Sequence, residues 1–141
     1  MKRVLQVLLW MICAAHVVIG LGLNLAPGFG QQMAGLYGAT VDWTPQFTYI
    51  LKPLGAFMLT VGLLAGVAAT DPARYSAIVY GVVALLVMRS AQRLLFAGEI
   101  SRAFNIESAR NVTFLAVFLT LAVVLAVLCQ RVAKPAPKTS G

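Results

Sequence analysis

Four long apolar stretches dominate the sequence and constrain its fold more than any other feature. They cover about residues 4–23, 49–69, 75–96 and 112–130. A helix of about 20 apolar residues can cross the hydrocarbon core of a bilayer. Only 11% of the residues are charged, against about 25% in soluble domains, and the mean hydropathy is +0.87. The sequence therefore predicts an all-α integral membrane protein, with a four-transmembrane-helix bundle over residues 1–131.

The segments outside the four stretches complete the predicted organisation. The first stretch follows Lys2 and Arg3, but it is longer than the 7–15-residue core of a signal peptide, so we expect a retained helix. The short connection of residues 70–74 predicts that the second and third helices are antiparallel neighbours. The loop of residues 24–48 is expected to include a short helix along the membrane surface. Residues 132–141 are predicted to form a basic, Pro-rich C-terminal tail.

The distribution of basic residues predicts the orientation of the chain. The side with both termini and the second connection carries six of them: Lys2, Arg3, Arg74, Arg131, Lys134 and Lys138. The loops of the other side carry Arg102 and Arg110, and its total is five when Lys52, Arg89 and Arg93 are included. Cytoplasmic loops carry an excess of Lys and Arg. We therefore expect a bacterial inner-membrane protein with both termini in the cytoplasm.

Two arginines interrupt the third apolar stretch near its end. The 14 residues from Tyr75 to Met88 precede Arg89 and span only about 21 Å as a helix. That length is shorter than a hydrocarbon core of roughly 30 Å, so this helix crosses only if it carries an arginine into the membrane. A charge at the membrane centre costs on the order of 3 kcal/mol. A compensating contact is therefore expected.

This arginine pair is the predicted site. Arg89 and Arg93 are four residues apart and share a helix face, with Gln92 beside them. Lys52 lies at the same side of the second helix and extends the positive site, while Glu99 is a candidate counter-ion. Three interpretations are open. The arginines reach lipid phosphates and pair with Glu99, or they bind an anion, a lipid headgroup or a quinone carbonyl, or they contact a partner subunit.

Small residues at helical spacing predict close contacts between helices, because they let backbones approach in lipid. On the second helix these are Gly55, Gly62 and Gly66. On the third helix they are Ala77, Gly81, Ala84 and Ala91, on a face rotated from the arginines by roughly 120°. We expect both sets to pack inside the bundle.

His16 is the only histidine and lies within the first helix. A haem with two histidine ligands from this chain is excluded because it needs a second imidazole. A single axial ligand to a pigment stays open, beside a buried histidine that is hydrogen-bonded at a helix contact. Cys13 and Cys129 lack the CxxC spacing of metal and redox motifs, so no metal site is predicted.

The sequence contains no motif that indicates catalysis. It lacks paired carboxylates within an apolar stretch, an HExxH sequence, a P-loop and a nucleophile elbow. An acidic residue in mid-membrane would suggest proton transport, and none is present. The net charge of +7 is spread along the chain, which favours membrane lipids over nucleic acid as partners. We expect a protein that is not an enzyme.

The arrangement resembles the DoxX-like small four-helix membrane proteins, a group that includes relatives of unknown function. The similar pieces are Pro27 after the first helix, the Leu36-Tyr37-Gly38 sequence, the glycine-spaced second helix and the stretch of residues 85–99. The resemblance covers about residues 4–130 and implies a four-helix bundle without assigned catalytic residues. Some DoxX-type proteins accompany quinone-linked oxidoreductases.

The predicted function is a non-catalytic accessory or scaffold subunit of a larger membrane complex, with a redox-linked or energy-converting complex as the first candidate. The alternative is a stand-alone lipid- or quinone-binding protein that uses the Arg89/Arg93 face. We expect no cofactor. The alternatives are a bound quinone, or a pigment with His16 as its axial ligand. Membrane lipids and other membrane protein subunits are the expected partners.

Overall fold

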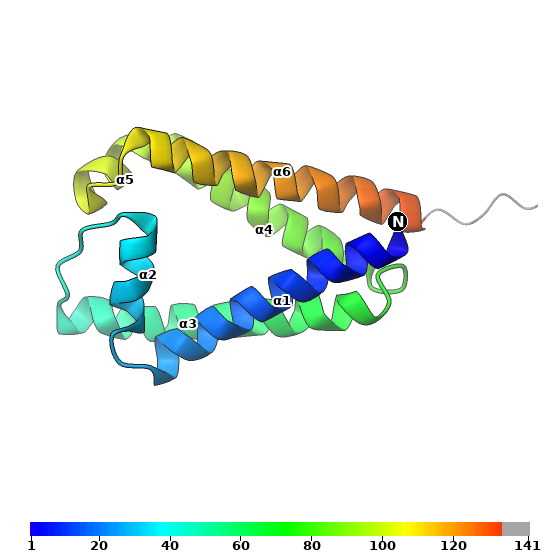
Figure 1. Cartoon of the computed structure of the whole chain (residues 1–141), viewed down its shortest axis with the longest axis horizontal. Coiled ribbons are helices and arrows are strands. Elements are labelled where there is room, and N and C mark those ends of the chain that lie inside the picture. The colour runs from blue at the N-terminus through cyan, green and yellow to red at the C-terminus, as the bar shows by residue number, and fades with distance from the viewer. Residues whose placement is uncertain (134–141) are drawn as a thin grey trace, which may run out of the picture.

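The computed structural model describes residues 1–133, and within them the chain is helical without strands (Figure 1). Four long helices are each apolar enough to cross a membrane: α1 (Lys2–Leu25), α3 (Pro45–Thr70), α4 (Ser76–Leu95) and α6 (Ser108–Ala133). Their ends lie within about four residues of the predicted ones. The predicted fold class is therefore confirmed. The predicted tail lies outside the described residues, apart from Val132 and Ala133 of α6.

The four long helices form two antiparallel pairs rather than an evenly packed bundle. The first pair, α1 and α3, and the second pair, α4 and α6, share the most extensive contacts in the chain. The two pairs approach each other near the chain's N-terminus, at the converging end, and separate toward the diverging end (Figure 1). α3 and α4 run antiparallel, as their short connection predicted, but they touch mainly near that connection and then diverge.

Glycines bring the helices of the first pair into backbone contact. A Cβ at Gly20 would lie 2.7 Å from the carbonyl oxygen of Gly55, which is closer than real Cβ atoms approach. Gly62 lies against Val17 and Cys13 in the same way, and Gly66 lies against the Sγ atom of Cys13. Gly55, Gly62 and Gly66 are all buried. The glycine face of α3 is therefore its contact surface with α1.

The second pair packs through larger side chains. The buried residues of α4 are Val79, Val82, Leu86 and Ser90, and those of α6 are Asn111, Ala122, Leu125 and Cys129. The predicted packing face of α4 is wrong, because Ala77, Gly81, Ala84 and Ala91 are exposed, and a Cβ at Gly81 would meet nothing within 4 Å. The aliphatic face turns inward because it fills the space beside α6, which small residues would leave empty.

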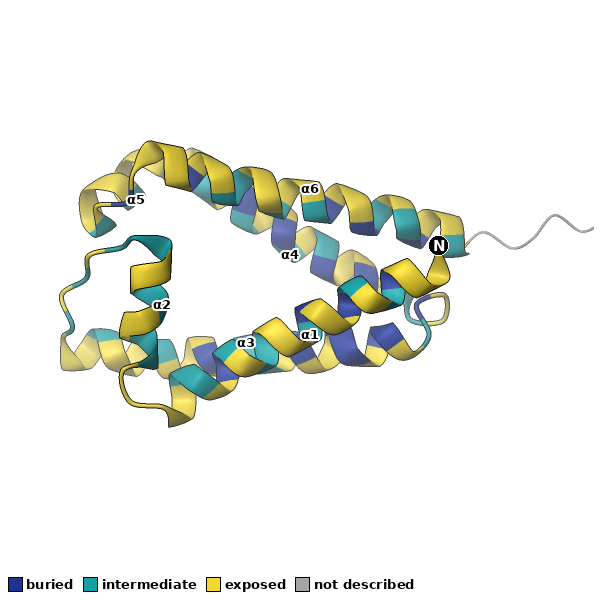
Figure 2. Cartoon of the chain, in the orientation of Figure 1, coloured by how far each residue is buried: buried dark blue, intermediate teal, exposed yellow. Residues whose placement is uncertain are grey.

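The apolar core lies toward the converging end. Buried side chains from all four long helices meet there, including Leu5 and Leu9 of α1, Val79 of α4 and Leu125 of α6. Figure 2 shows the buried residues gathered where the pairs approach, whereas the diverging end is mostly exposed or intermediate. The bundle is therefore close-packed over only part of its length.

Two short helices, α2 (Phe29–Tyr37) and α5 (Ala97–Phe104), lie at the diverging end (Figure 1). Gly28 and Gly38 flank α2 with φ angles of 78° and 67°, a left-handed conformation that glycine adopts readily. These turns direct α2 across the space between the two pairs. The amide of Thr40, after α2, donates a hydrogen bond of 2.8 Å to the carbonyl oxygen of Phe104 in α5. The two short helices together bridge the diverging end.

Candidate functional site

A cavity of about 440 Å³ lies between the two helix pairs at the diverging end. Its volume is within the range of small-molecule binding sites. The first pair contributes apolar residues such as Ile19 and Met58, and α2 contributes Met33 and Tyr37. Ile100 and Phe104 of α5 extend the apolar lining. We call this space the arginine cavity, because Arg89 and Arg93 of α4 are its only charged lining residues within the described chain.

The predicted arginine pair does share one face of α4. Arg89 and Arg93 are both partly buried, and both line the arginine cavity together with Gln92. The helix ends only two residues after Arg93, at Leu95, so the pair occupies its last two turns. The arginines therefore face the space between the two helix pairs.

Arg93 is held by polar and aromatic neighbours. Its Nη1 atom donates a hydrogen bond of 2.8 Å to Oδ1 of Asn111, and the Nδ2 atom of Asn111 donates one of 3.0 Å to the carbonyl oxygen of Arg93. The guanidinium carbon lies 5.1 Å from the ring centre of Phe114 and 5.7 Å from those of Tyr37 and Phe118. Aromatic rings attract a cation over their faces. These contacts offset part of the cost of its burial.

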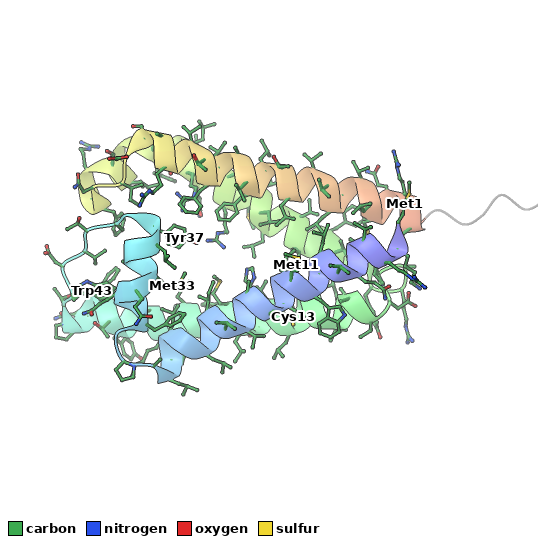
Figure 3. All side chains as sticks on the ribbon, viewed as in Figure 1. Met1, Met11, Cys13, Met33, Tyr37 and Trp43 are labelled. Atoms are coloured by element: carbon green, nitrogen blue, oxygen red, sulfur yellow. The ribbon has the colours of Figure 1, made fainter. Side chains whose placement is uncertain are left out.

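Tyr37 links this arrangement to α2. Its ring centre is 4.7 Å from that of Phe114, and Figure 3 shows Tyr37 at the end of α2 nearest the second pair. Trp43, which follows α2, also lines the cavity and lies 5.5 Å from Phe47, centre to centre. Aromatic residues of α2, of the segment after it and of α3 therefore line this end of the cavity.

Arg89 has a simpler environment than Arg93. Its guanidinium carbon lies 4.6 Å from the ring centre of Phe118. Among the described residues it makes no hydrogen bond through its side chain and no ion pair. Its five N–H donors are therefore available to a ligand or to water in the arginine cavity.

Two residues of the predicted site lie elsewhere. Lys52 is exposed and borders a separate hollow beside Asn24 and Gln31, so the predicted extension of the positive site by Lys52 is wrong. Glu99, on α5, is also exposed and does not line the cavity. The predicted ion pair with Glu99 is likewise absent from residues 1–133, in which Lys2 and Asp71 form the one ion pair, with Nζ and Oδ1 3.2 Å apart.

His16 is partly buried within α1. Its Nδ1 atom lies 2.9 Å from the carbonyl oxygen of Ile12, and because a carbonyl only accepts, Nδ1 carries the hydrogen in this contact. Its Nε2 atom is buried without a hydrogen-bond partner among the described residues. Within that part of the chain no group of three or more metal-ligating side chains comes together. The His16 pigment interpretation stays a prediction.

Sequence reasoning missed the residues that hold Arg93. Asn111 is buried with 6% exposure, although a polar residue at the start of an apolar stretch looks like a boundary residue. Phe114 and Phe118 follow it at intervals of three and four, which places them on the Asn111 face of α6. An asparagine followed by two aromatics at this spacing was the available signal. Its pairing with Arg93 depends on the α4/α6 register, which no local pattern reveals.

The fold and the site define an integral membrane protein with four transmembrane helices and an internal, positively charged cavity. Comparisons with protein-family models, with curated proteins and with solved structures found no match to this chain.

Proposed function

We propose that this protein binds an amphipathic molecule, such as a lipid or a quinone, in the arginine cavity. The observation that supports this is the combination of a cavity of about 440 Å³ with apolar walls and two arginines at one place on its lining. Ligand sites in proteins commonly join an apolar enclosure to a few placed polar groups. The role is binding rather than catalysis, and the DoxX-like relationship stays a prediction.

The proposed setting is a bacterial inner membrane with both termini in the cytoplasm, as the distribution of basic residues favours. In this orientation α2 and α5 lie at the outer surface, and the arginine cavity is at the outer end of the bundle. A ligand would enter from the outer leaflet with its polar head at the depth of Arg89 and Arg93.

Fluorescence quenching tests the proposal, because Trp43 lines the cavity and Trp10 is the one other tryptophan. A Trp10→Phe protein in mild detergent would be titrated with a twelve-carbon chain that carries bromine and ends in either a carboxylate or an alcohol. Bromine quenches tryptophan on contact. We expect saturable quenching of Trp43 by at least one of the two probes.

Two matched controls locate the binding. Ala34→Phe on α2 fills part of the cavity and should abolish the saturable quenching. Leu36→Phe adds a similar ring to an exposed position of the same helix, where Leu36 is 72% exposed, and should preserve it. A Trp43→Phe protein, which reports through exposed Trp10, should show only non-saturable quenching from the micelle. Non-saturable quenching of Trp43 by both probes would overturn the proposed function.

A second candidate is the accessory-subunit role, with a redox-linked complex as its first setting. The small residues of α4 favour it, since Ala77, Gly81 and Ala84 are all exposed and the space beside Gly81 is open among the described residues. Small residues at this spacing allow another transmembrane helix to approach closely. Gly81→Leu would block that approach. If purification in mild detergent yields the same set of proteins with wild type and Gly81→Leu, this face is not the contact.

A further inference from the structure

The two arginines of the cavity have different environments, which separates their roles. The guanidinium of Arg93 is hydrogen-bonded to Asn111 and lies near three aromatic rings. Arg89 has one ring contact, with Phe118, and its N–H donors have no acceptor among the described residues. Arg93 therefore joins α4 to α6 through Asn111, whereas Arg89 presents to the cavity a guanidinium without any hydrogen-bond partner within residues 1–133.

The cavity holds no negative charge that would neutralise Arg89. No Asp or Glu lines it within residues 1–133. Glu99 is exposed. Asp71 pairs with Lys2 at the converging end of the bundle, where α1 begins and α3 ends. Arg89 is partly buried among apolar side chains, and an unpaired charge in an apolar environment is costly. A neutral ligand leaves that cost in place, whereas an anionic group removes it.

The lining opposite the arginines selects the rest of the ligand. Ile19 and Leu23 of α1 and Leu54 and Met58 of α3 form an apolar wall on the first pair. A single acyl chain with a compact head suits an apolar space of about 440 Å³ that has its polar groups at one place. Gln92, beside Arg89, supplies amide groups that can donate to the same head.

We propose that Arg89 is the anion-binding residue of the cavity, and that the ligand is a single-chain amphiphile with an anionic head. This inference rests on the proposed function, because it requires that the arginine cavity binds an amphiphile. The head is a carboxylate, as in a fatty acid, or a phosphate monoester, as in a lipid with one acyl chain. Either group accepts two parallel hydrogen bonds from a guanidinium. Among the described residues, Arg89 has all of its N–H donors free for this contact, whereas Arg93 has one N–H committed to Asn111 and its guanidinium held in place by that bond.

Three bromine-bearing twelve-carbon probes test this inference in the Trp10→Phe protein: a carboxylate, a phosphate monoester and an alcohol. We expect at least one anionic probe to bind about ten- to a hundredfold more tightly than the alcohol, since hydrogen bonds to a charged group contribute about 1.5–3 kcal/mol. The better of the two anions identifies the source of the ligand. Equal affinity for all three probes overturns the anionic head while leaving the proposed function intact.

Substitutions then assign the preference to one residue. Arg89→Gln should reduce the anion-to-alcohol ratio of affinities to near one while the alcohol still quenches Trp43 saturably. The matched control is Arg102→Gln, which also removes one positive charge but on the exposed face of α5, and it should keep the full ratio. An Arg89→Gln protein that keeps the ratio would overturn the assignment.

A second variant covers the case in which Arg89→Gln fails to fold. Arg89→Lys keeps the charge but loses the planar pair of donors, so the anion preference should fall several-fold and stay above one. An unchanged preference in Arg89→Lys would show that the bidentate geometry of Arg89 is not used. That result would overturn the two-bond contact and would leave the positive charge at this position as the source of the preference.

Discussion

The converging and diverging halves of the bundle are built from different residues and have different packing. At the converging end, aliphatic side chains from all four long helices fill the interior, with Leu5, Leu9 and Leu125 fully buried. At the diverging end, arginines, aromatics and methionines surround a cavity of about 440 Å³. The converging half therefore supplies most of the packed core, whereas the diverging half keeps an open cavity, which is where the proposed ligand would bind.

Leu9→Ala should produce the largest loss of stability, because Leu9 is fully buried in the converging half. Truncation of a buried leucine to alanine typically costs about 2–5 kcal/mol. The matched control is Leu54→Ala in the diverging half, where Leu54 lines the cavity and is 46% exposed. We expect it to change the free energy of unfolding by about 0.5 kcal/mol.

Thermal unfolding in detergent measures both variants against the wild type. A melting temperature that falls strongly for Leu9→Ala and little for Leu54→Ala supports the comparison. Equal losses would show that the diverging half is as tightly packed as the core, and would contradict the proposed difference in packing between the two halves.

Gly20→Ala should cause the second-largest loss of stability. It tests whether the wall that the first pair forms beside the cavity is rigid. An added Cβ would lie 2.7 Å from backbone atoms of both Gly55 and Leu59, and backbone cannot move aside as a flexible side chain does. Overpacking of this kind costs about 1–3 kcal/mol. The matched control is Gly81→Ala, where the space is open.

Alanine is the better helix former by about 1 kcal/mol, so Gly81→Ala should unfold at the same temperature as the wild type or above it. A Gly20→Ala protein as stable as Gly81→Ala would mean that α1 and α3 separate easily. In that case the cavity would lack a firm wall on this side.

The sequence predicted the four transmembrane helices well because each depends on local composition and length. It also identified the arginine pair, since a charge within an apolar stretch requires a partner wherever the helix packs. The partners themselves were missed. Asn111 and Phe118 lie 18 and 25 residues beyond Arg93 in the chain, and their contact with the arginines depends on the register of α4 against α6.

The wrong predictions share a physical cause. Lys52 and Glu99 were placed by their side of the membrane and the small residues of α4 by their helical spacing, and neither criterion says how the helices are arranged around one another. The chain forms two pairs that diverge. Gly81 and its neighbouring small residues therefore face outward, and the side chain of Lys52 borders a different hollow. The angle between the two pairs is a property of the whole fold, so no local pattern could supply it.

Asn111→Ala should have the smallest of the three effects on stability and the clearest effect on the diverging half. It removes both hydrogen bonds between Asn111 and Arg93, and an unsatisfied, partly buried group costs about 1–3 kcal/mol. The remaining ring contacts of Arg93 with Phe114 and Phe118 should keep the loss near the lower end of that range. The matched control is Thr113→Ala, which removes a hydrogen bond from an exposed position of the same helix.

The two Asn111 hydrogen bonds fix α4 against α6 beside Arg89, so their loss should also loosen that wall of the cavity. Hydrogen exchange should rise at the amides of α4 near Arg93 in Asn111→Ala, and stay at the wild-type level near Val79 in the converging half. Faster exchange in both halves alike would show that they open together. In that case the two halves would not be independent in their local opening, and the proposed division of roles between them would be contradicted.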